Sequence, residues 1–149
     1  MLSASPGCAT KRDCEQMKEG GVRMSLHESG ENYLETILLL QRRNGFVRAV
    51  DVANELGYTK ASISRAMRIL RENGYILIAH SGQITLTEAG MDKACDIYER
   101  HCVITQFLMQ TLQLDMDAAD ADACRIEHVV SEETFERIRE YVKREARLL

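Results

Sequence analysis

The sequence has almost no proline, no tryptophan and no long apolar run. One proline, Pro6, occurs in 149 residues, and aromatic residues make up 5% of the chain. So little proline, together with many Leu, Ala, Glu and Arg residues, favours helices, and 45% hydrophobic residues can form a mainly aliphatic core. Uninterrupted apolar stretches reach only four or five residues, as in 37–40 and 75–79, which excludes a membrane-spanning helix.

The cysteines do not form a recognisable framework. Their number is odd and no C-x-x-C pair occurs, which argues against a disulfide scaffold and against a zinc ribbon. The five positions are Cys8, Cys14, Cys95, Cys102 and Cys124. Reduced thiols are expected, and with them a cytoplasmic location.

Residues 1–25 are predicted to be a disordered extension, because Ser, Gly, Pro and Lys dominate there without periodicity. The segment mixes both charge signs and lacks an apolar run, so it does not resemble a signal peptide. The codons of residues 19–21 can spell a ribosome-binding sequence, which makes Met24 a second candidate for the translation start.

Charge is divided unevenly along the chain. The net charge of −4 argues mildly against nucleic acid as a partner, since phosphate binding needs clustered Lys and Arg. Locally, however, residues 58–74 carry four basic residues and one acidic residue, whereas 115–136 carry eight acidic residues and one basic residue. This asymmetry indicates two separate tasks.

Periodicity predicts a mainly α-helical chain with one β-hairpin. The predicted helices span about 31–43, 50–56, 59–73, 87–111, 117–130 and 131 to the C-terminus, and the strands span 75–79 and 83–87. Helix, short helix, glycine turn at Gly57, helix and hairpin is the order of a winged helix-turn-helix. We therefore predict a winged helix-turn-helix DNA-binding domain over 26–88, followed by a helical metal-binding and dimerisation domain over 89–149.

The second helix of this motif has a basic outer face. Its inner stripe consists of Ile63, Ala66, Met67 and Leu70. The residues predicted to contact DNA are Lys60, Ser62, Ser64, Arg65 and Arg68, since hydroxyls and guanidinium groups bond phosphates or guanine. The alternatives are a solvated basic face and a winged helix that binds protein.

A possible metal-binding set lies further along the chain. Cys124, Glu127 and His128 stand at i, i+3 and i+4, so on a helix they share one face. His101 lies in register with the apolar stripe of its own helix, where a histidine is either a core residue or a ligand. On the first helix, Asn32 and Glu35 also share a face.

Several motifs resemble the diphtheria toxin repressor and manganese transport regulator family. They are Glu31-Asn-Tyr-Leu-Glu-Thr-Ile, Ser62-Ile-Ser-Arg-Ala, Leu86-Thr-Glu-Ala-Gly, Ile97-Tyr-Glu-Arg-His and the segment from Asp122 to Thr134. The resemblance covers about residues 26–142. It implies a homodimeric, metal-activated repressor of metal-uptake genes, with double-stranded operator DNA as partner and with no membrane or small organic ligand.

Carried over residue by residue, the resemblance implies that His101, Cys124, Glu127 and His128 are metal ligands, with Glu35 as in the manganese type. Asn32 departs from both types, which have Asp or Met there; its carbonyl oxygen can ligate but brings no charge. Thr105 stands where the iron type has a carboxylate in an ancillary site. The third domain of the iron type has no counterpart, so in length the chain resembles the manganese type.

The donor set gives a partial answer on the metal. A thiolate favours softer ions such as Fe(II), whereas Glu35 and Asn32 favour hard ions such as Mn(II). We expect Fe(II), with Mn(II) close behind. Ligands from both halves would fix the spacing of two recognition helices in a dimer, which must match half-sites about 34–36 Å apart.

Three other functions are open at this point. A metal-blind winged-helix regulator would leave Cys124, Glu127 and His128 without a role, and a protein-binding winged helix would leave the basic face without one. An enzyme is the third alternative. No phosphate loop, nucleophile elbow or H-E-x-x-H motif occurs, so we do not predict enzymatic activity.

Overall fold

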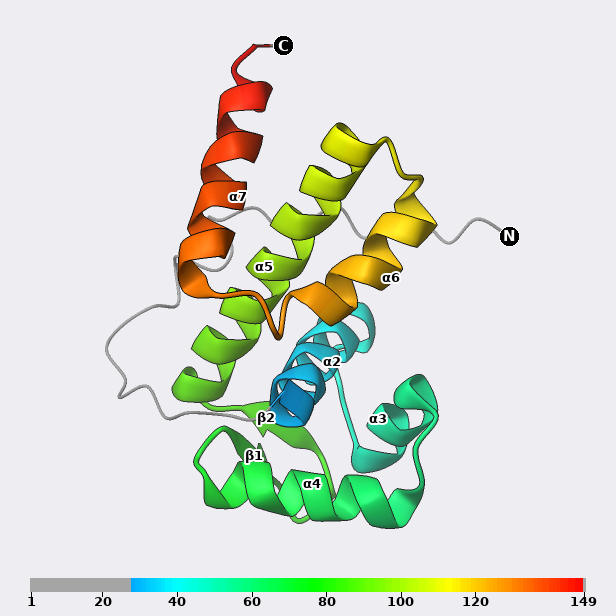
Figure 1. The fold of residues 1–149 in the computed structure, drawn as a ribbon. Coiled ribbons are helices and arrows are strands. Elements are labelled where there is room, and N and C mark those ends of the chain that lie inside the picture. The colour runs from blue at the N-terminus through cyan, green and yellow to red at the C-terminus, as the bar shows by residue number, and fades with distance from the viewer. Residues whose placement is uncertain (1–27, 149) are drawn as a thin grey trace. The chain divides into compact units, whose positions relative to one another are not determined.

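The computed structural model describes residues 28–148, and the predicted disordered extension lies outside them. The elements in chain order are α2 (Glu28–Asn44), α3 (Ala49–Leu56), α4 (Lys60–Glu72), β1 (Ile76–Ile78), β2 (Ile84–Leu86), α5 (Glu88–Leu112), α6 (Met116–Ile126) and α7 (Glu132–Ala146) (Figure 1). The prediction of a mainly helical chain with one hairpin is confirmed. Within residues 28–148, no helix is both long and apolar enough to cross a membrane.

The chain divides into two compact units between Cys95 and Asp96, inside α5. The described part of the first unit, residues 28–95, contains α2, α3, α4, the hairpin and the start of α5. The second, residues 96–148, contains the rest of α5 together with α6 and α7.

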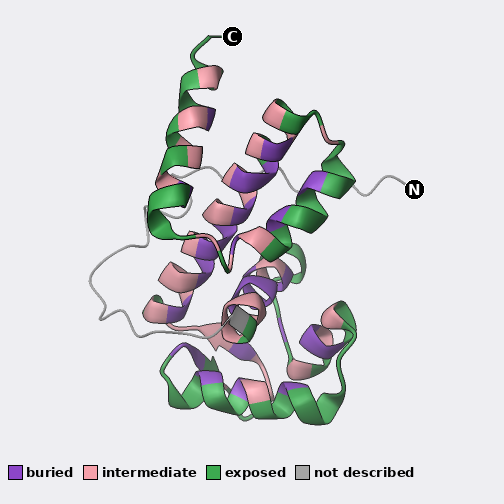
Figure 2. Ribbon diagram, viewed as in Figure 1, coloured by how far each residue is buried: buried purple, intermediate pink, exposed green. Residues whose placement is uncertain are grey.

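The glycine turn in the first unit joins α3 to α4. Gly57 ends α3 in the left-handed conformation at φ 69°, which costs glycine little. Thr59 then caps α4, since its side-chain oxygen accepts a hydrogen bond from the Ser62 N–H at 3.2 Å. The inner face of α4 buries Ile63, Met67 and Leu70, whereas its outer face is exposed along most of its length (Figure 2).

The hairpin is shorter than predicted. β1 and β2 are antiparallel with Ile76 opposite Leu86 and Ile78 opposite Ile84. Gly82 forms the turn at φ 88° and donates to Ala79 O at 2.8 Å. The outer residues of the predicted strands still bond to one another: the Ala79 N–H donates to Gln83 O at 2.9 Å beside the turn, and the Thr87 N–H donates to Tyr75 O at 3.0 Å at the start of α5.

A close backbone approach anchors the start of α5. Thr87 Oγ1 donates to Gly74 O at 2.6 Å and accepts from the Gly90 N–H at 3.1 Å. A Cβ atom on Gly90 would lie 1.9 Å from Tyr75 O, so only glycine fits at this position.

The second unit has its own core, made of Ile104, Leu108, Ala119, Ala123 and Phe135. Phe135 and Val142 on α7 are also buried, so the apolar side of α7 contributes to the packing of this unit. Cys95 and Cys124 are free thiols, as expected for reduced cysteines.

The predicted helix over 117–130 ends early. α6 stops at Ile126, and the amide N–H groups of Val129 and Val130 both bond to Ile126 O, at 3.1 and 3.0 Å. A turn over residues 127–130 then leads into Ser131, which takes an extended conformation, φ −67° and ψ 157°, and caps α7. Glu127 and His128 therefore lie at the end of α6 and in the turn that follows it.

Candidate metal centre and nucleic-acid interface

The predicted DNA-contacting residues share the exposed side of α4. Lys60, Ser62, Ser64, Arg65 and Arg68 are all exposed. Within residues 28–148 neither Lys60 nor Arg65 forms an ion pair, and Arg68 lies 3.9 Å from Glu72 with both side chains more than half exposed. An exposed pair of this kind contributes little, so these cations can exchange water for phosphate.

The start of α4 suits an anion. Its first turn contains no acidic residue, and the free N–H groups at a helix N-terminus carry a partial positive charge. The Ser62 hydroxyl also takes part in the cap, since its oxygen accepts a hydrogen bond from Thr59 Oγ1 at 3.0 Å. The structure thus brings all five predicted residues to one solvent-facing surface, but it does not test their contact with DNA.

Four of the six predicted metal ligands come together in the second unit. His101 Nδ1 lies 2.8 Å from Glu127 Oε2 and 3.7 Å from Cys124 Sγ. On the other side of Glu127, Oε1 lies 3.2 Å from His128 Nε2. We call this group, together with Asp120, the His101 cluster.

Local helix geometry explains this meeting. His101 lies on the stripe of α5 that also buries Ile97, Ile104 and Leu108. Cys124 and Glu127 are three residues apart at the end of α6, and Glu127 keeps a helical conformation with its N–H bonded to Ala123 O at 2.9 Å. Residues at this spacing share a helix face, which here is turned toward α5.

Asp120 is the member of the cluster that sequence reasoning missed. Its Oδ1 lies 2.8 Å from His101 Nε2, and ligand atoms of His101, Asp120 and Cys124 lie within 4.8 Å of one another. Asp120 precedes Cys124 by four residues, so the same helix-face rule pointed to it, but many acidic residues surround it in the sequence.

In the metal-free protein the His101 ring is protonated at neutral pH. Burial lowers its pKa, but hydrogen bonds to Cys124, Glu127 and Asp120 and the charge of Glu127 outweigh burial and raise the pKa to about 11. With both ring nitrogens facing carboxylates, the two N–H groups can donate at once. The proton thereby supplies the positive charge that a fully buried Glu127 side chain requires.

The donor set fits a divalent transition metal. Imidazole, thiolate and carboxylate donors together suit Fe(II), Co(II), Zn(II) and Mn(II) to different degrees. His101, Cys124, Glu127 and His128 would hold the ion, which would supply the positive charge that the His101 proton otherwise provides among the carboxylates.

The other two predicted ligands, Asn32 and Glu35, lie on α2 in the first unit. The side chain of Glu35 is buried, with 6% exposed, and glutamate is seldom buried to this degree unless it is paired. Asn32 is half-buried, and its backbone oxygen accepts a hydrogen bond from Thr36 Oγ1 at 2.8 Å. Their role as ligands stays a prediction from the resemblance. Thr105 donates to His101 O at 2.8 Å, so its hydroxyl serves the backbone of α5.

Comparison with protein families matches both parts of the chain. Residues 25–83 match the N-terminal DNA-binding domain of the iron dependent repressor, and residues 87–146 match its metal binding and dimerisation domain. Together the two matches cover most of the described residues.

Individual relatives agree with this match. An uncharacterized HTH-type transcriptional regulator of Methanocaldococcus jannaschii is 31% identical over 120 residues, which cover 80% of this chain and 96% of the relative. The transcriptional regulator MntR of Escherichia coli is 32% identical over 114 residues, covering 76% of this chain and 73% of the relative.

A solved structure of a manganese-dependent transcriptional repressor complex with manganese superposes with a TM-score of 0.71 and 28% identity. It matches 76% of this chain and 52% of its own. The chain described here therefore spans about half the length of that solved protein.

Proposed function

Because this chain belongs to the iron-dependent repressor family, we propose that it is a metal-activated, DNA-binding transcriptional repressor of genes for metal-ion homeostasis. The observation that supports this most directly is the His101 cluster, in which nitrogen, sulfur and oxygen donors from α5 and α6 converge. The exposed basic face of α4 supplies the DNA-binding part of the proposal. Residues 26–88 would bind operator DNA, and 89–149 would hold the metal and dimerise.

His101, Cys124, Glu127 and His128 are the proposed ligands, and the metal is Fe(II), with Mn(II) as the close alternative. The free thiol of Cys124 favours the softer ion. Cys124→Ser removes the soft donor but keeps a small polar side chain. We expect this change to lower affinity for Fe(II) and Co(II) more than affinity for Mn(II), in anaerobic competition titrations with a fluorescent chelator.

The proposed partners are double-stranded operator DNA and a second copy of the chain, in the cytoplasm. A twofold dimer presents two α4 helices to half-sites one DNA turn apart. Metal binding has to change DNA affinity by only about 1–3 kcal/mol per site for effective control.

The test is anaerobic DNA binding by fluorescence anisotropy, using DNA upstream of metal-transport genes from the source genome. Parallel titrations contain chelator, Fe(II), Mn(II) or Zn(II). The proposal requires that affinity rise with metal in the wild type and not in His128→Ala. Equal affinity in chelator and in every metal would leave a metal-blind regulator, and absence of DNA binding throughout would leave a protein-binding winged helix.

Glu35 gives a separate test of the ligand set. If its carboxylate is a ligand, Glu35→Gln, which keeps the shape of the buried side chain but removes its charge, lowers metal affinity. Unchanged metal affinity would remove Glu35 from the set without affecting the four residues of the second unit.

A further inference from the structure

The turn between α6 and α7, residues 127–130, carries two proposed ligands and needs hydrogen-bond partners from elsewhere. The last four carbonyl groups of an α-helix find no N–H donor within the helix itself. The N–H groups of Val129 and Val130 are satisfied by Ile126 O. The carbonyl groups of Glu127 and Val130, at the two ends of the turn, accept hydrogen bonds from a side chain outside it.

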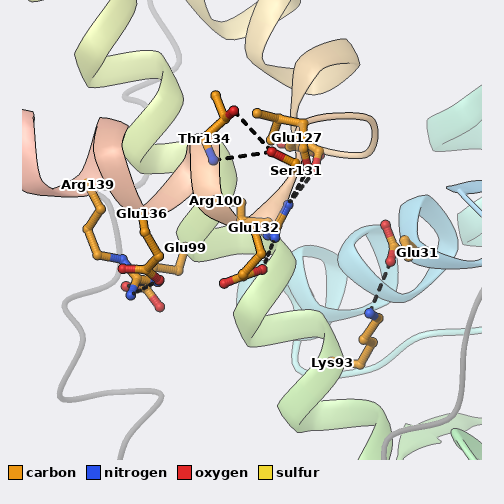
Figure 3. A network of polar contacts seen from close by, with 11 residues as sticks. Glu31, Lys93, Glu99, Arg100, Glu127, Ser131, Glu132, Thr134, Glu136 and Arg139 are labelled. Atoms are coloured by element: carbon orange, nitrogen blue, oxygen red, sulfur yellow. Dashed lines mark hydrogen bonds and ion pairs between the residues drawn. The ribbon is translucent and has the colours of Figure 1, made fainter.

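Arg100 is that donor. Its Nη1 atom donates to Glu127 O at 3.3 Å and to Val130 O at 3.2 Å, and its Nη2 atom donates to the Glu132 carboxylate on α7. The guanidinium also lies over the Phe135 ring, 4.8 Å from its centroid. Figure 3 shows the side chain reaching from α5 to Glu127 on one side and to Glu132 on the other.

The position of Arg100 in the sequence gives these bonds a consequence for the His101 cluster. Arg100 directly precedes His101 on α5, so one rigid helix carries both a proposed ligand and the donor that grips the turn. Glu127 contacts His101 through its side chain and Arg100 through its backbone. Glu127 is therefore held against α5 by two contacts, one through its carboxylate and one through its backbone oxygen.

We propose that Arg100 is a positioning residue for the metal centre: by bonding both carbonyl ends of the 127–130 turn, it holds Glu127 and His128 in place for coordination. This inference rests on the proposed function. Groups that orient metal ligands, without touching the metal, typically change metal affinity by about 10–100-fold when removed. A cation near the end of α6 is also favoured by the helix dipole.

Arg139 on α7 is a closely matched control. Its guanidinium lies over the same Phe135 ring, also 4.8 Å from the centroid. Its side chain is 22% exposed, compared with 20% for Arg100. Its ion pairs, however, go to Glu99 and Glu136 (Figure 3). Arg100 and Arg139 therefore share burial, charge and ring contact, and they differ in the bonds of Arg100 to the turn.

The experiment compares full-length wild type, Arg100→Gln, Arg139→Gln and Glu127→Gln. Three readouts are needed, of which the first two are the melting temperature of the metal-free protein and the Mn(II) and Co(II) affinity by competition with a fluorescent chelator. The visible spectrum of the Co(II)-loaded protein reports coordination geometry. We expect both arginine variants to lower the melting temperature, but only Arg100→Gln to weaken metal binding, by about 10–100-fold, and to alter the Co(II) spectrum.

Equal metal affinities in wild type and Arg100→Gln would overturn the inference, as would equal losses in the two arginine variants. The proposed function still stands after either of these results if the wild type binds metal and Glu127→Gln does not. A wild type that binds no metal overturns both the proposed function and the inference about Arg100. Should Arg100→Gln not fold, Glu132→Gln removes only the ion pair of the guanidinium. It should then weaken metal binding less than Glu127→Gln but measurably, and no change would count against the proposal.

Discussion

On α4 the charged side chains face water, whereas around His101 they face one another. Lys60 and Arg65 are exposed and need only exchange water for phosphate. In the His101 cluster, a buried carboxylate and an imidazolium already satisfy each other at 2.8 Å. A divalent ion bound there would have to displace the His101 proton, so the occupancy of this site would depend on pH and on metal concentration, whereas the face of α4 is preformed.

This difference indicates which part of the molecule can control DNA binding. Packing and the Thr59 cap fix the conformation of α4, so its exposed face has no second state that a ligand could favour. A cluster whose charge balance depends on a bound cation can change state, and so can the turn beside it. Ligand control of DNA binding therefore has its origin, in this account, in the second unit.

The largest effect is expected at Glu127. Glu127→Gln keeps the shape of the side chain but removes the charge that balances the cation, so metal affinity should fall by at least about 100-fold, the upper end of the effect of ligand-orienting groups. Metal-activated DNA binding should disappear with it. Chelator competition and anisotropy measure the two effects, and Glu133→Gln, which removes an exposed charge from the first turn of α7, is the control. Normal activation in Glu127→Gln would contradict the site.

Metal binding should also depend steeply on pH. The pKa of His101 is raised to about 11, so at neutral pH a ligating ring must release a proton. Each proton released on binding adds about tenfold per pH unit, so apparent Mn(II) affinity should rise by at least about tenfold for each unit between about pH 6 and about pH 8. Titrations in a series of buffers measure this slope, and a flat profile would exclude His101 as a ligand.

The same proton has the opposite effect on the metal-free protein. Since the pKa of His101 is higher in the folded chain than its ordinary value of 6.5, its contribution to stability is complete below about pH 6.5 and is lost as pH rises toward 11. Denaturant unfolding in chelator should show that decline. His101→Gln should remove the part of the decline that belongs to this group.

An intermediate effect is expected on the DNA side. Arg65→Ala removes an exposed guanidinium from α4, which costs about 1–3 kcal/mol of binding free energy if it contacts guanine. If it contacts phosphate, the slope of log affinity against log salt should fall by about one. Metal affinity should not change. Arg147→Ala, an exposed arginine of the second unit, is the control, and equal DNA affinity in wild type and Arg65→Ala would remove the contact.

The smallest effect is expected at the cap of α4. Thr59→Ala removes the acceptor for the Ser62 N–H and should cost about 1 kcal/mol of unfolding free energy, with a modest loss of DNA affinity. Thr59→Ser keeps the hydroxyl and should recover most of both. A Thr59→Ala protein as stable as wild type would show that the cap contributes nothing.

Local patterns predicted much of this molecule. The Gly57 turn, the Thr59 cap and the 3.6-residue stripe of α4 depend only on neighbouring residues, and they predicted the helix-turn-helix and its exposed face. His101 could be placed on the buried side of its helix for the same reason. Such features follow from the chain itself, before any packing between distant elements.

What could not be predicted depends on contacts between elements. The turn that follows α6 is bonded by Arg100, which lies 27 residues before Glu127 in the chain, and it leads into the extended Ser131. Asp120 was hidden among many acidic residues, and only its distance to His101 distinguishes it. Phe135 is part of the core because α7 lies against α5 and α6, which no periodicity specifies.

The central claim is that metal and DNA binding are thermodynamically linked, and linkage is reciprocal. The direct measurement is Mn(II) or Fe(II) affinity of the protein with and without saturating operator DNA, under anaerobic conditions. The account predicts tighter metal binding in the presence of operator, by about 5–150-fold, and by the same factor as metal tightens DNA binding. Identical metal affinities with and without DNA would contradict it.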